Sequence, residues 1–215
     1  MLFLGPAENY RRVQKAFKGD FVACLDSPII KSGIQFVNRH DWVASLDQFD
    51  WVASFGFRYK VPKWFLDKLP HRCINIHISL LPWNKGAYPN VWAHLENTPH
   101  GITIHEMDEG LDTGPCLVQT IVHPDVGPAT TFRDTWSCLM DVATDTFCKS
   151  WRDVKAGVYP PLQQKPGGSS HVRCELGSVA DCLPQLWDTP IRQAKKAYEA
   201  ADADAGFFDE IPFET

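Results

Sequence analysis

Short apolar runs alternate with segments of helical spacing along the first three quarters of the chain. Most of these runs are bounded by glycine, proline or charged residues, which is typical of buried strands. The six runs are MLFLG (1–5), FVACLD (21–26), DWVASFG (50–56), CINIHIS (73–79), GITIHEMD (101–108) and CLVQTIVHP (116–124). After the first run, Tyr10, Val13 and Phe17 recur at helical spacing, and residues 61–70 predict a short helix. This alternation predicts an α/β domain built on a Rossmann-like, doubly wound and mostly parallel sheet.

A longer helical stripe follows the last apolar run. It passes through Phe132, Trp136, Leu139, Ala143, Phe147 and Trp151. Thr130 or Thr131 is expected to cap its start, and Gly157 to end it. We therefore predict a core domain over 1–158 and a C-terminal appendage over 159–215 that packs on the core. The appendage is expected to contain a loop (165–171), a short amphipathic helix (within 188–204) and a solvated acidic tail.

The pentapeptide DWVAS occurs twice, at 41–45 and at 50–54. An offset this short does not make a solenoid, whose period is longer and is repeated many times. We therefore expect only the second copy to be a core strand.

Composition and charge narrow the class of protein. A chain of 215 residues with 44% hydrophobic content can bury a sizeable core. The net charge of −5 argues against a nucleic-acid binder, which would carry a basic stripe. The seven cysteines include no C-x-x-C pair, so we expect reduced thiols, most of them in the core. Neither a signal peptide nor a membrane-length apolar run is present, so we expect a cytoplasmic protein that does not bind membranes.

The run 73–79 contains the polar pair Asn75 and His77. Residues two apart in a strand point to the same side, so this pair shares one face. Ligands of parallel sheets bind beyond the carboxyl ends of the strands, where His77 and the glycine-flanked Asp112 are expected. Asn75 and His77 could stabilise an oxyanion, His77 could transfer a proton, and Asp112 could orient the imidazole. These groups suit acyl transfer without a covalent enzyme intermediate.

Structural explanations for the same residues stay open. A histidine at a strand end is commonly a hydrogen-bonded corner, and an Asp-Thr-Gly triplet is commonly a turn. His77, His105 and Asp112 could in principle bind a metal, but their spacing is not diagnostic of a metal site. We therefore predict no metal.

The stretch NIHISLLPWNKGAYPN (75–90), followed by GITIHEMDEGLDTGPCLVQ (101–119), resembles the folate-dependent formyltransferases, most closely the small sugar-nucleotide N-formyltransferases. The family carries N-x-H-x-S-x-L-P and, further along, G-x-D-x-G, and both match here in order and spacing. The resemblance implies N10-formyltetrahydrofolate as the formyl donor. It also implies that Asn75 and His77 hold the formyl oxygen, while Asp112 supports the charge of His77 and helps to remove a proton from the attacking amine.

The resemblance also implies the residues around the two substrates. The folate is expected between two loops formed by Phe57, Arg58, Tyr59 and Val61 and by Asp108, Glu109, Gly110 and Leu111. For the side chains of Phe57 and Tyr59, ordinary packing is an equal alternative. The acceptor is expected near Ser79, Trp83, Lys85, Tyr88 and Asn90. Ordinary packing is also open for Trp83 and Tyr88, and Ser79 could instead bond the loop backbone. By analogy with similar enzymes, residues 159–178 are expected to form a small hairpin at a homodimer interface.

Three acceptor classes compete within the family. Enzymes that act on methionyl-tRNA carry a further RNA-binding domain, which we do not expect in this acidic chain. Enzymes that act on glycinamide ribonucleotide bind its phosphate on a glycine-rich loop after the first strand, where Pro6 removes an amide donor. We therefore expect a nucleotide-linked amino sugar, with dTDP or UDP, of the kind formylated for surface polysaccharide. A non-catalytic binding module for folate or a sugar nucleotide, and a hydrolase that releases formate, remain the alternatives outside this activity.

Overall fold

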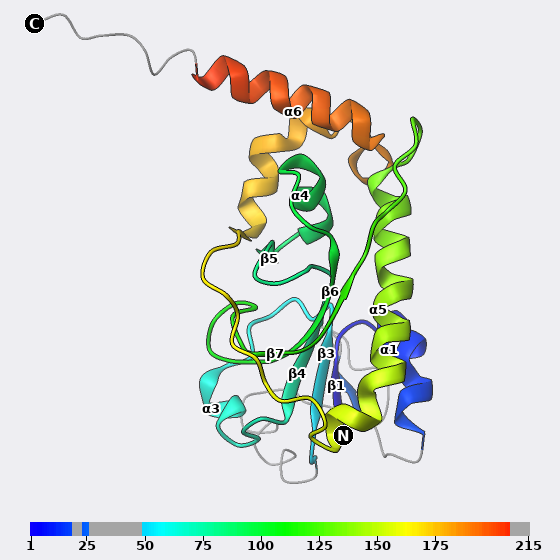
Figure 1. Ribbon diagram of the computed structural model, residues 1–215, viewed down its shortest axis with the longest axis vertical. Coiled ribbons are helices and arrows are strands. Elements are labelled where there is room, and N and C mark those ends of the chain that lie inside the picture. The colour runs from blue at the N-terminus through cyan, green and yellow to red at the C-terminus, as the bar shows by residue number, and fades with distance from the viewer. Residues whose placement is uncertain (19–22, 26–48, 207–215) are drawn as a thin grey trace, which may run out of the picture.

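The computed structural model describes residues 1–18, 23–25 and 49–206, with side chains outside 23–25 and 202–206 (Figure 1). A six-stranded sheet forms the centre of the molecule, in the order β2-β1-β3-β4-β6-β7. Its strands are β1 (Leu2–Leu4), β2 (Ala23–Leu25), β3 (Val52–Phe55), β4 (Cys73–His77), β6 (Gly101–Glu106) and β7 (Cys116–Ile121). All six predicted apolar runs therefore contain a strand, and the α/β class is confirmed. The first DWVAS copy, at 41–45, lies outside the described residues.

The strands do not all run in one direction. The pairs β1–β2, β1–β3 and β3–β4 are parallel, whereas β4–β6 and β6–β7 are antiparallel. Only residues 107–115, which contain no helix, connect β6 to β7, and a parallel pair needs a longer crossover. The antiparallel edge was not predicted from the sequence, and it determines which side chains meet at the site.

The helices cover the two faces of the sheet unequally. One face packs against α1 (Ala7–Val13), the short 3₁₀ segment η1 (Gln14–Phe17) and α5 (Phe132–Lys155). The other face packs against α3, a helix of only four residues (Lys63–Leu66). The apolar cluster under α3 reaches Cys73 at the start of β4. Asn75 and His77 lie further along the same face.

The long helix α5 follows its predicted stripe. The stripe residues Phe132, Leu139, Ala143, Phe147 and Trp151 are all buried. Thr131 caps the start: its Oγ1 accepts a hydrogen bond from the Asp134 amide, and the Asp134 carboxylate accepts one from the Thr131 amide. Gly157, at φ +69°, follows the last turn, as expected. Trp136 also lies in α5, but it is 38% exposed and lines a surface cavity.

The C-terminal part differs from its prediction. Residues 159–178 do not form a hairpin, because their strand β8 (Ser170–His171) pairs in parallel with β5 (Lys85–Gly86), far away in the sequence. The predicted loop 165–171 therefore ends in a strand. The remaining elements are α4 (Pro89–Leu95), η2 (Arg173–Cys182), η3 (Leu186–Asp188) and α6 (Ile191–Gly206). Figure 1 shows α6 lying across the end of the molecule beside α4.

A third apolar cluster joins this C-terminal part to the rest. It combines Val91, Trp92 and Leu95 of α4 with residues of η2 and α6. Its other buried members are Phe132, Val179, Leu183, Ile191 and Ala194. Residues 173–194 therefore share an apolar core with α4 and the start of α5.

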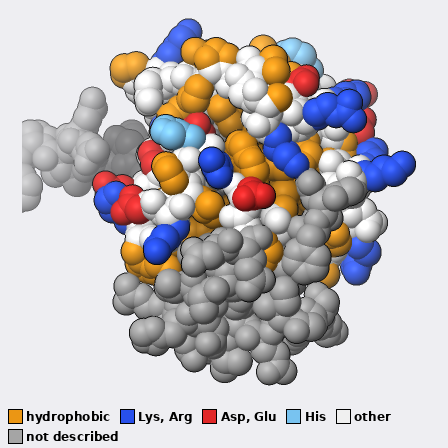
Figure 2. Space-filling model, turned by 90° about the horizontal axis from the view of Figure 1, so that it is seen from below, with side chains coloured by type: hydrophobic (Ala, Val, Ile, Leu, Met, Phe, Trp, Pro, Cys, Tyr) orange, Lys and Arg blue, Asp and Glu red, His pale blue; other side chains and the backbone are white. Residues whose placement is uncertain are grey.

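The charged side chains on the surface and the character of the helices relate to the prediction that the protein does not bind membranes. Figure 2 shows Lys and Arg interspersed with Asp and Glu around the described part of one face. None of the helices within the described ranges is both long enough and apolar enough to span a bilayer.

The six cysteines whose side chains the structure describes are free thiols, and Cys73, Cys116 and Cys182 are buried. Burial raises the pKa of the Cys73 thiol to about 12, so this thiol is not reactive.

Candidate active site

Two cross-strand pairs of polar residues lie side by side where β4 pairs with β6. In the antiparallel register Asn75 lies opposite His105, and His77 lies opposite Thr103. Isoleucines occupy the alternate positions of both strands and are buried in the α5 face of the sheet. The alternation in each strand thus places all four polar side chains on the face opposite α5.

Asp112 reaches this polar face from the loop between β6 and β7. Its Oδ1 accepts a hydrogen bond from Asn75 Nδ2 at 3.1 Å, and its Oδ2 accepts one from the Gly86 amide at 2.9 Å. The same oxygens lie 3.3 Å from His105 Nε2 and 3.5 Å from His77 Nδ1, respectively. One carboxylate therefore contacts or faces four groups from β4, β5 and β6.

The loop needs special backbone positions to place this carboxylate. Asp112 adopts φ +54°, a left-handed conformation that aspartate tolerates better than most residues. A Cβ on Gly114 would lie 2.0 Å from the Glu106 carbonyl oxygen, so only glycine fits there. The backbone geometry of the loop therefore explains why the motif has aspartate at position 112 and glycine at position 114.

Asp112 is ionised despite its burial. Its side chain is only 10% exposed, and burial by itself would raise the pKa. The charge of His77, the hydrogen bond and charge of His105 and the Gly86 amide outweigh burial and hold the pKa of Asp112 well below its usual range. The site therefore contains a fixed negative charge beside two imidazoles.

Each imidazole ring is anchored through one of its two nitrogens. His77 Nε2 lies 3.0 Å from the Asn84 carbonyl oxygen, and His105 Nδ1 lies 2.7 Å from that of Glu106. A carbonyl only accepts, so each of these nitrogens carries a proton. The other nitrogen of each ring is thereby turned toward Asp112. This arrangement lets a proton be held or exchanged between an imidazole and the carboxylate.

A cavity of about 80 Å³ opens beside Asn75, His105 and Asp112. Six of the residues predicted to bind folate line it: Phe57, Tyr59, Val61, Asp108, Gly110 and Leu111. Arg58 and Glu109 do not line it, although they belong to the same two loops. The two loops that the sequence analysis singled out thus line the same cavity.

The residues predicted to bind the acceptor are not gathered in the same way. Ser79 Oγ donates to the Trp83 carbonyl at 2.8 Å, and Lys85 Nζ donates to the Pro82 carbonyl at 3.1 Å. Asn90 donates to the Phe132 carbonyl and accepts from the Thr135 hydroxyl. Trp83 is 36% exposed. The hydroxyl, amide and ammonium groups of this set therefore have partners within the chain.

Tyr88 and Asn90 line a second cavity, of about 420 Å³. This cavity lies at the starts of α4 and α5, beside η3, and its wall includes Trp136 and Trp187. None of Asn75, His77 and Asp112 lines it. The larger cavity is therefore separate from the polar cluster.

Three residues of the site were missed or underrated from the sequence. His105 was considered only as a metal ligand, Gly86 was noted only as part of the resemblance to the family, and Gln164 was not considered. The signal for His105 is the alternation in GITIHE, which places Thr103 and His105 on one face. Gln164 Nε2 donates to the carbonyls of Asp112 and Gly114, both at 2.8 Å. Within the described ranges, no group of His, Cys, Asp and Glu has the arrangement of a metal site.

The fold and this cluster define a class: an α/β protein with an Asn-His-Asp site at the carboxyl edge of its parallel strands. Residues 32–135 match the family described as Formyl transferase. The formyltransferase PseJ from Anoxybacillus kamchatkensis, solved with UDP-4,6-dideoxy-4-formamido-L-AltNAc and tetrahydrofolate, is 33% identical, with a TM-score of 0.76. That alignment covers 90% of this chain and 96% of PseJ. The chain belongs to the formyl transferase family.

Two curated relatives extend the comparison. The dTDP-4-amino-4,6-dideoxyglucose formyltransferase of Mycobacterium tuberculosis is 35% identical over 128 residues, which are 60% of this chain and 53% of that protein. The methionyl-tRNA formyltransferase of Lachnospira eligens is 32% identical over 125 residues, which are 58% of this chain and 39% of that protein. The chain thus spans about half or less of the length of these curated relatives.

Proposed function

We propose that this protein transfers a formyl group from N10-formyltetrahydrofolate to the amine of a nucleotide-linked amino sugar. The observation that carries this proposal is the buried Asp112 carboxylate, which contacts Asn75, faces His77 and borders the cavity between the two predicted folate loops. Formyl transfer to an amine needs oxyanion stabilisation and removal of one proton, and these side chains can supply both.

The cavity has the chemistry expected for the folate ring. Phe57, Val61 and Met107 supply apolar surface to the cavity, and Asp108 and Asn75 supply polar groups. Its volume of about 80 Å³ is well below the roughly 300 Å³ at the lower end of small-molecule pockets. We therefore expect the loops 57–61 and 107–112 to move apart when the donor binds. The bound folate supplies an activated formyl group, so no nucleotide energy source or metal is required.

Asn75 and His77 would bind the formyl oxygen as negative charge develops on it. Asn75 Nδ2 donates to Asp112 Oδ1 at 3.1 Å and lies 3.3 Å from His105 Nε2, and these two contacts fix the plane of the amide. The N–H that faces His105 would turn to the formyl oxygen when the substrates bind. His77 is held by the Asn84 carbonyl at one nitrogen, and its other nitrogen lies at the cluster. The bond from the amine nitrogen to the formyl carbon forms, the bond to N10 breaks, and the amine proton passes by way of His77 to N10, while the Asp112 carboxylate supports the charge of His77.

A nucleotide-linked amino sugar is the favoured acceptor on similarity. PseJ was solved with a UDP-linked formamido sugar, and the alignment covers almost the whole of PseJ. A dTDP-amino-sugar formyltransferase is among the curated relatives, and so are methionyl-tRNA formyltransferases, which makes methionyl-tRNA the second candidate acceptor. Homodimer formation and a cytoplasmic location stay predictions, and light scattering of the purified protein would test the first.

The test is a formyl-transfer assay read by mass spectrometry. The protein is incubated with N10-formyltetrahydrofolate and, separately, UDP-linked and dTDP-linked amino sugars, glycinamide ribonucleotide and methionyl-tRNA. We expect one formyl group to be added to a sugar nucleotide and not to the other acceptors. Formylation of methionyl-tRNA or of the ribonucleotide alone would overturn the acceptor assignment. Formate release without any amine would identify a hydrolase, and binding without turnover would identify a binding module.

A further inference from the structure

The C-terminal segment Leu162–His171 runs past both loops that build the polar cluster. Leu162 exchanges two backbone hydrogen bonds with Cys116, at 2.8 and 2.9 Å, just after the loop that carries Asp112. At its other end, β8 pairs with Lys85–Gly86, and the Gly86 amide is the one that donates to Asp112. The segment is thus fixed at both ends beside the site.

Gln164 lies between these ends and holds the Asp112 loop by its backbone. Its Nε2 donates at 2.8 Å to the Asp112 carbonyl and at 2.8 Å to the Gly114 carbonyl. The two N–H groups of this amide therefore fix the carbonyls of Asp112 and Gly114, one on each side of Thr113. Asp112 is the residue of this loop with the left-handed backbone conformation. The remaining acceptor, Gln164 Oε1, is buried and has no partner among the described residues. A buried oxygen without a partner is unfavourable, so a glutamine at this position indicates that its two N–H groups have a specific role.

Ser169 holds the other loop in the same way. Its Oγ accepts from the Asn84 amide at 2.9 Å and donates to Asn84 Oδ1 at 3.1 Å. Asn84 is fully buried, and its main-chain carbonyl oxygen anchors the His77 ring. The same ten-residue segment therefore contacts the support of Asp112 and the support of His77.

We propose that Gln164 and Ser169 are positioning residues of the active site, which set the Asp112 carboxylate and the His77 ring at their working separation. The proposal rests on the proposed formyl transfer but concerns residues outside its motifs. Neither side chain needs to touch the folate or the amine. Each fixes a loop whose displacement by about 1 Å can reduce turnover on the order of 100-fold.

The experiment compares Gln164→Ala and Ser169→Ala with matched neighbours. Gln163→Ala and Ser170→Ala are the controls, because both of these residues are exposed and neither lines the polar cluster. We expect kcat to fall about 10- to 100-fold in the first pair, with folate affinity within about twofold of the parent protein. The controls should keep the kcat of the parent protein. Equal kcat in all four variants, or losses of kcat only in proportion to lost folded protein, would overturn the proposal.

A second readout does not depend on activity. The Gly86 amide is bonded to the Asp112 carboxylate, so its hydrogen exchange reports whether that carboxylate stays in place. Gln164→Ala should accelerate exchange at Gly86 at least about tenfold, while Gln163→Ala should leave it unchanged. If the parent protein formylates no acceptor, the proposed function fails, yet this exchange measurement still decides the role of Gln164. Unchanged Gly86 exchange in Gln164→Ala would overturn it whatever the activity.

Discussion

At the scale of single residues, the site depends on one buried carboxylate. Asp112 accepts hydrogen bonds from β4 and β5 and faces imidazoles of β4 and β6. Removing one partner of a buried charged cluster leaves the others uncompensated, which costs more than the loss of an exposed ion pair. His77 and Asp112 act on each other, so we expect their roles in turnover to be coupled.

Replacing Asp112 should therefore abolish most turnover. Asp112→Asn keeps the shape of the side chain but removes its charge, so the support for a protonated His77 is lost. We expect kcat to fall by roughly 10²- to 10⁴-fold, the usual range for lost acid–base assistance. Asp125→Asn is the control, because Asp125 is exposed and lies outside the site. Turnover near that of the parent protein in Asp112→Asn would contradict the assigned role, and loss of the fold would make Asp112 a structural residue.

At the scale of elements, the start of α5 is fixed by a reciprocal cap. Thr131 and Asp134 satisfy each other's backbone amides, and Phe132 directly after the cap is fully buried. The cap therefore places the first turn of α5 against α4, where the third apolar cluster begins. Because the cap fixes the residue at which α5 begins, the apolar residues of the helix face the core in one register only.

Removal of the cap should lower stability in a position-specific way. Thr131→Ala should cost about 1 kcal/mol, which lowers Tm by roughly 2–4 °C in a chain of this size. Thr144→Ala is the matched control: its hydroxyl bonds back to the Met140 carbonyl inside the helix, where alanine is at least as favourable. Thermal unfolding measures both variants. Equal losses in the two would show that the cap contributes nothing special.

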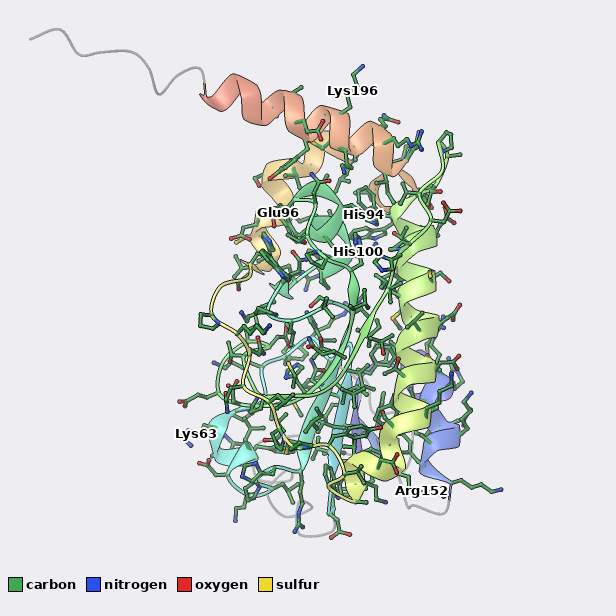
Figure 3. The ribbon with its side chains drawn as sticks, in the orientation of Figure 1. Lys63, His94, Glu96, His100, Arg152 and Lys196 are labelled. Carbon is green, nitrogen blue, oxygen red and sulfur yellow. The ribbon has the colours of Figure 1, made fainter. Side chains whose placement is uncertain are left out.

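A buried histidine of α4, His94, lies against the partly buried His100, which directly precedes β6. His94 and His100 have ring centroids 4.2 Å apart, and Figure 3 shows both between α4 and α5, below α6. Burial lowers the pKa of His94 to about 3, helped by His100 and Lys195. Burial likewise lowers the pKa of His100 to about 4, helped by Lys195 and His123. Both rings are therefore neutral in the folded protein near neutral pH.

This pair predicts acid-sensitive stability. Both pKa values lie below the ordinary 6.5, so the unfolded chain binds more protons than the folded one as the pH falls below that value. The stabilising contribution is complete above pH 6.5 and is lost toward pH 4, by up to about 1.4 kcal/mol per pH unit for each ring. His100→Leu should flatten this dependence in urea unfolding between about pH 7 and 4.5. An identical slope in the parent protein and His100→Leu would refute the assignment.

At the scale of the whole molecule, the candidate folate site joins segments that are distant in sequence. The cavity is lined by the loops after β3 and β6, and Gln164 of the C-terminal segment donates to the backbone of Asp112, which lines the cavity. The site therefore exists only when the sheet and the C-terminal part are both folded. A ligand that binds there should stabilise the molecule as a unit.

A stable folate should raise the melting temperature. At 5-formyltetrahydrofolate concentrations about 100 times Kd, binding adds about 2.7 kcal/mol, which corresponds to a rise of roughly 5–10 °C. The thermal-shift series should include UDP and dTDP, alone and with the folate, since an additional rise would identify the nucleotide. The absence of any shift with the folate at high concentration would count against the donor.

The sequence by itself determined the local features of this protein. Periodicity located the six strands and α5, and the i, i+2 spacing placed Asn75 and His77 on one face, because the direction of a side chain is a property of its own segment. The motifs identified the family, and the resemblance singled out two loops that line the same cavity. Helical spacing does not show what packs against a residue, and Trp136 of the stripe is 38% exposed.

Only the tertiary structure decided which distant segments meet. The antiparallel direction of β6 puts His105 opposite Asn75, and the parallel pairing of β5 with β8 replaces the predicted hairpin. Gln164 reaches Asp112 across 52 residues of sequence, in a stretch that had been expected to form that hairpin. Such contacts depend on strand order and on packing over the whole molecule, and these long-range interactions leave no periodic pattern in the segments they join.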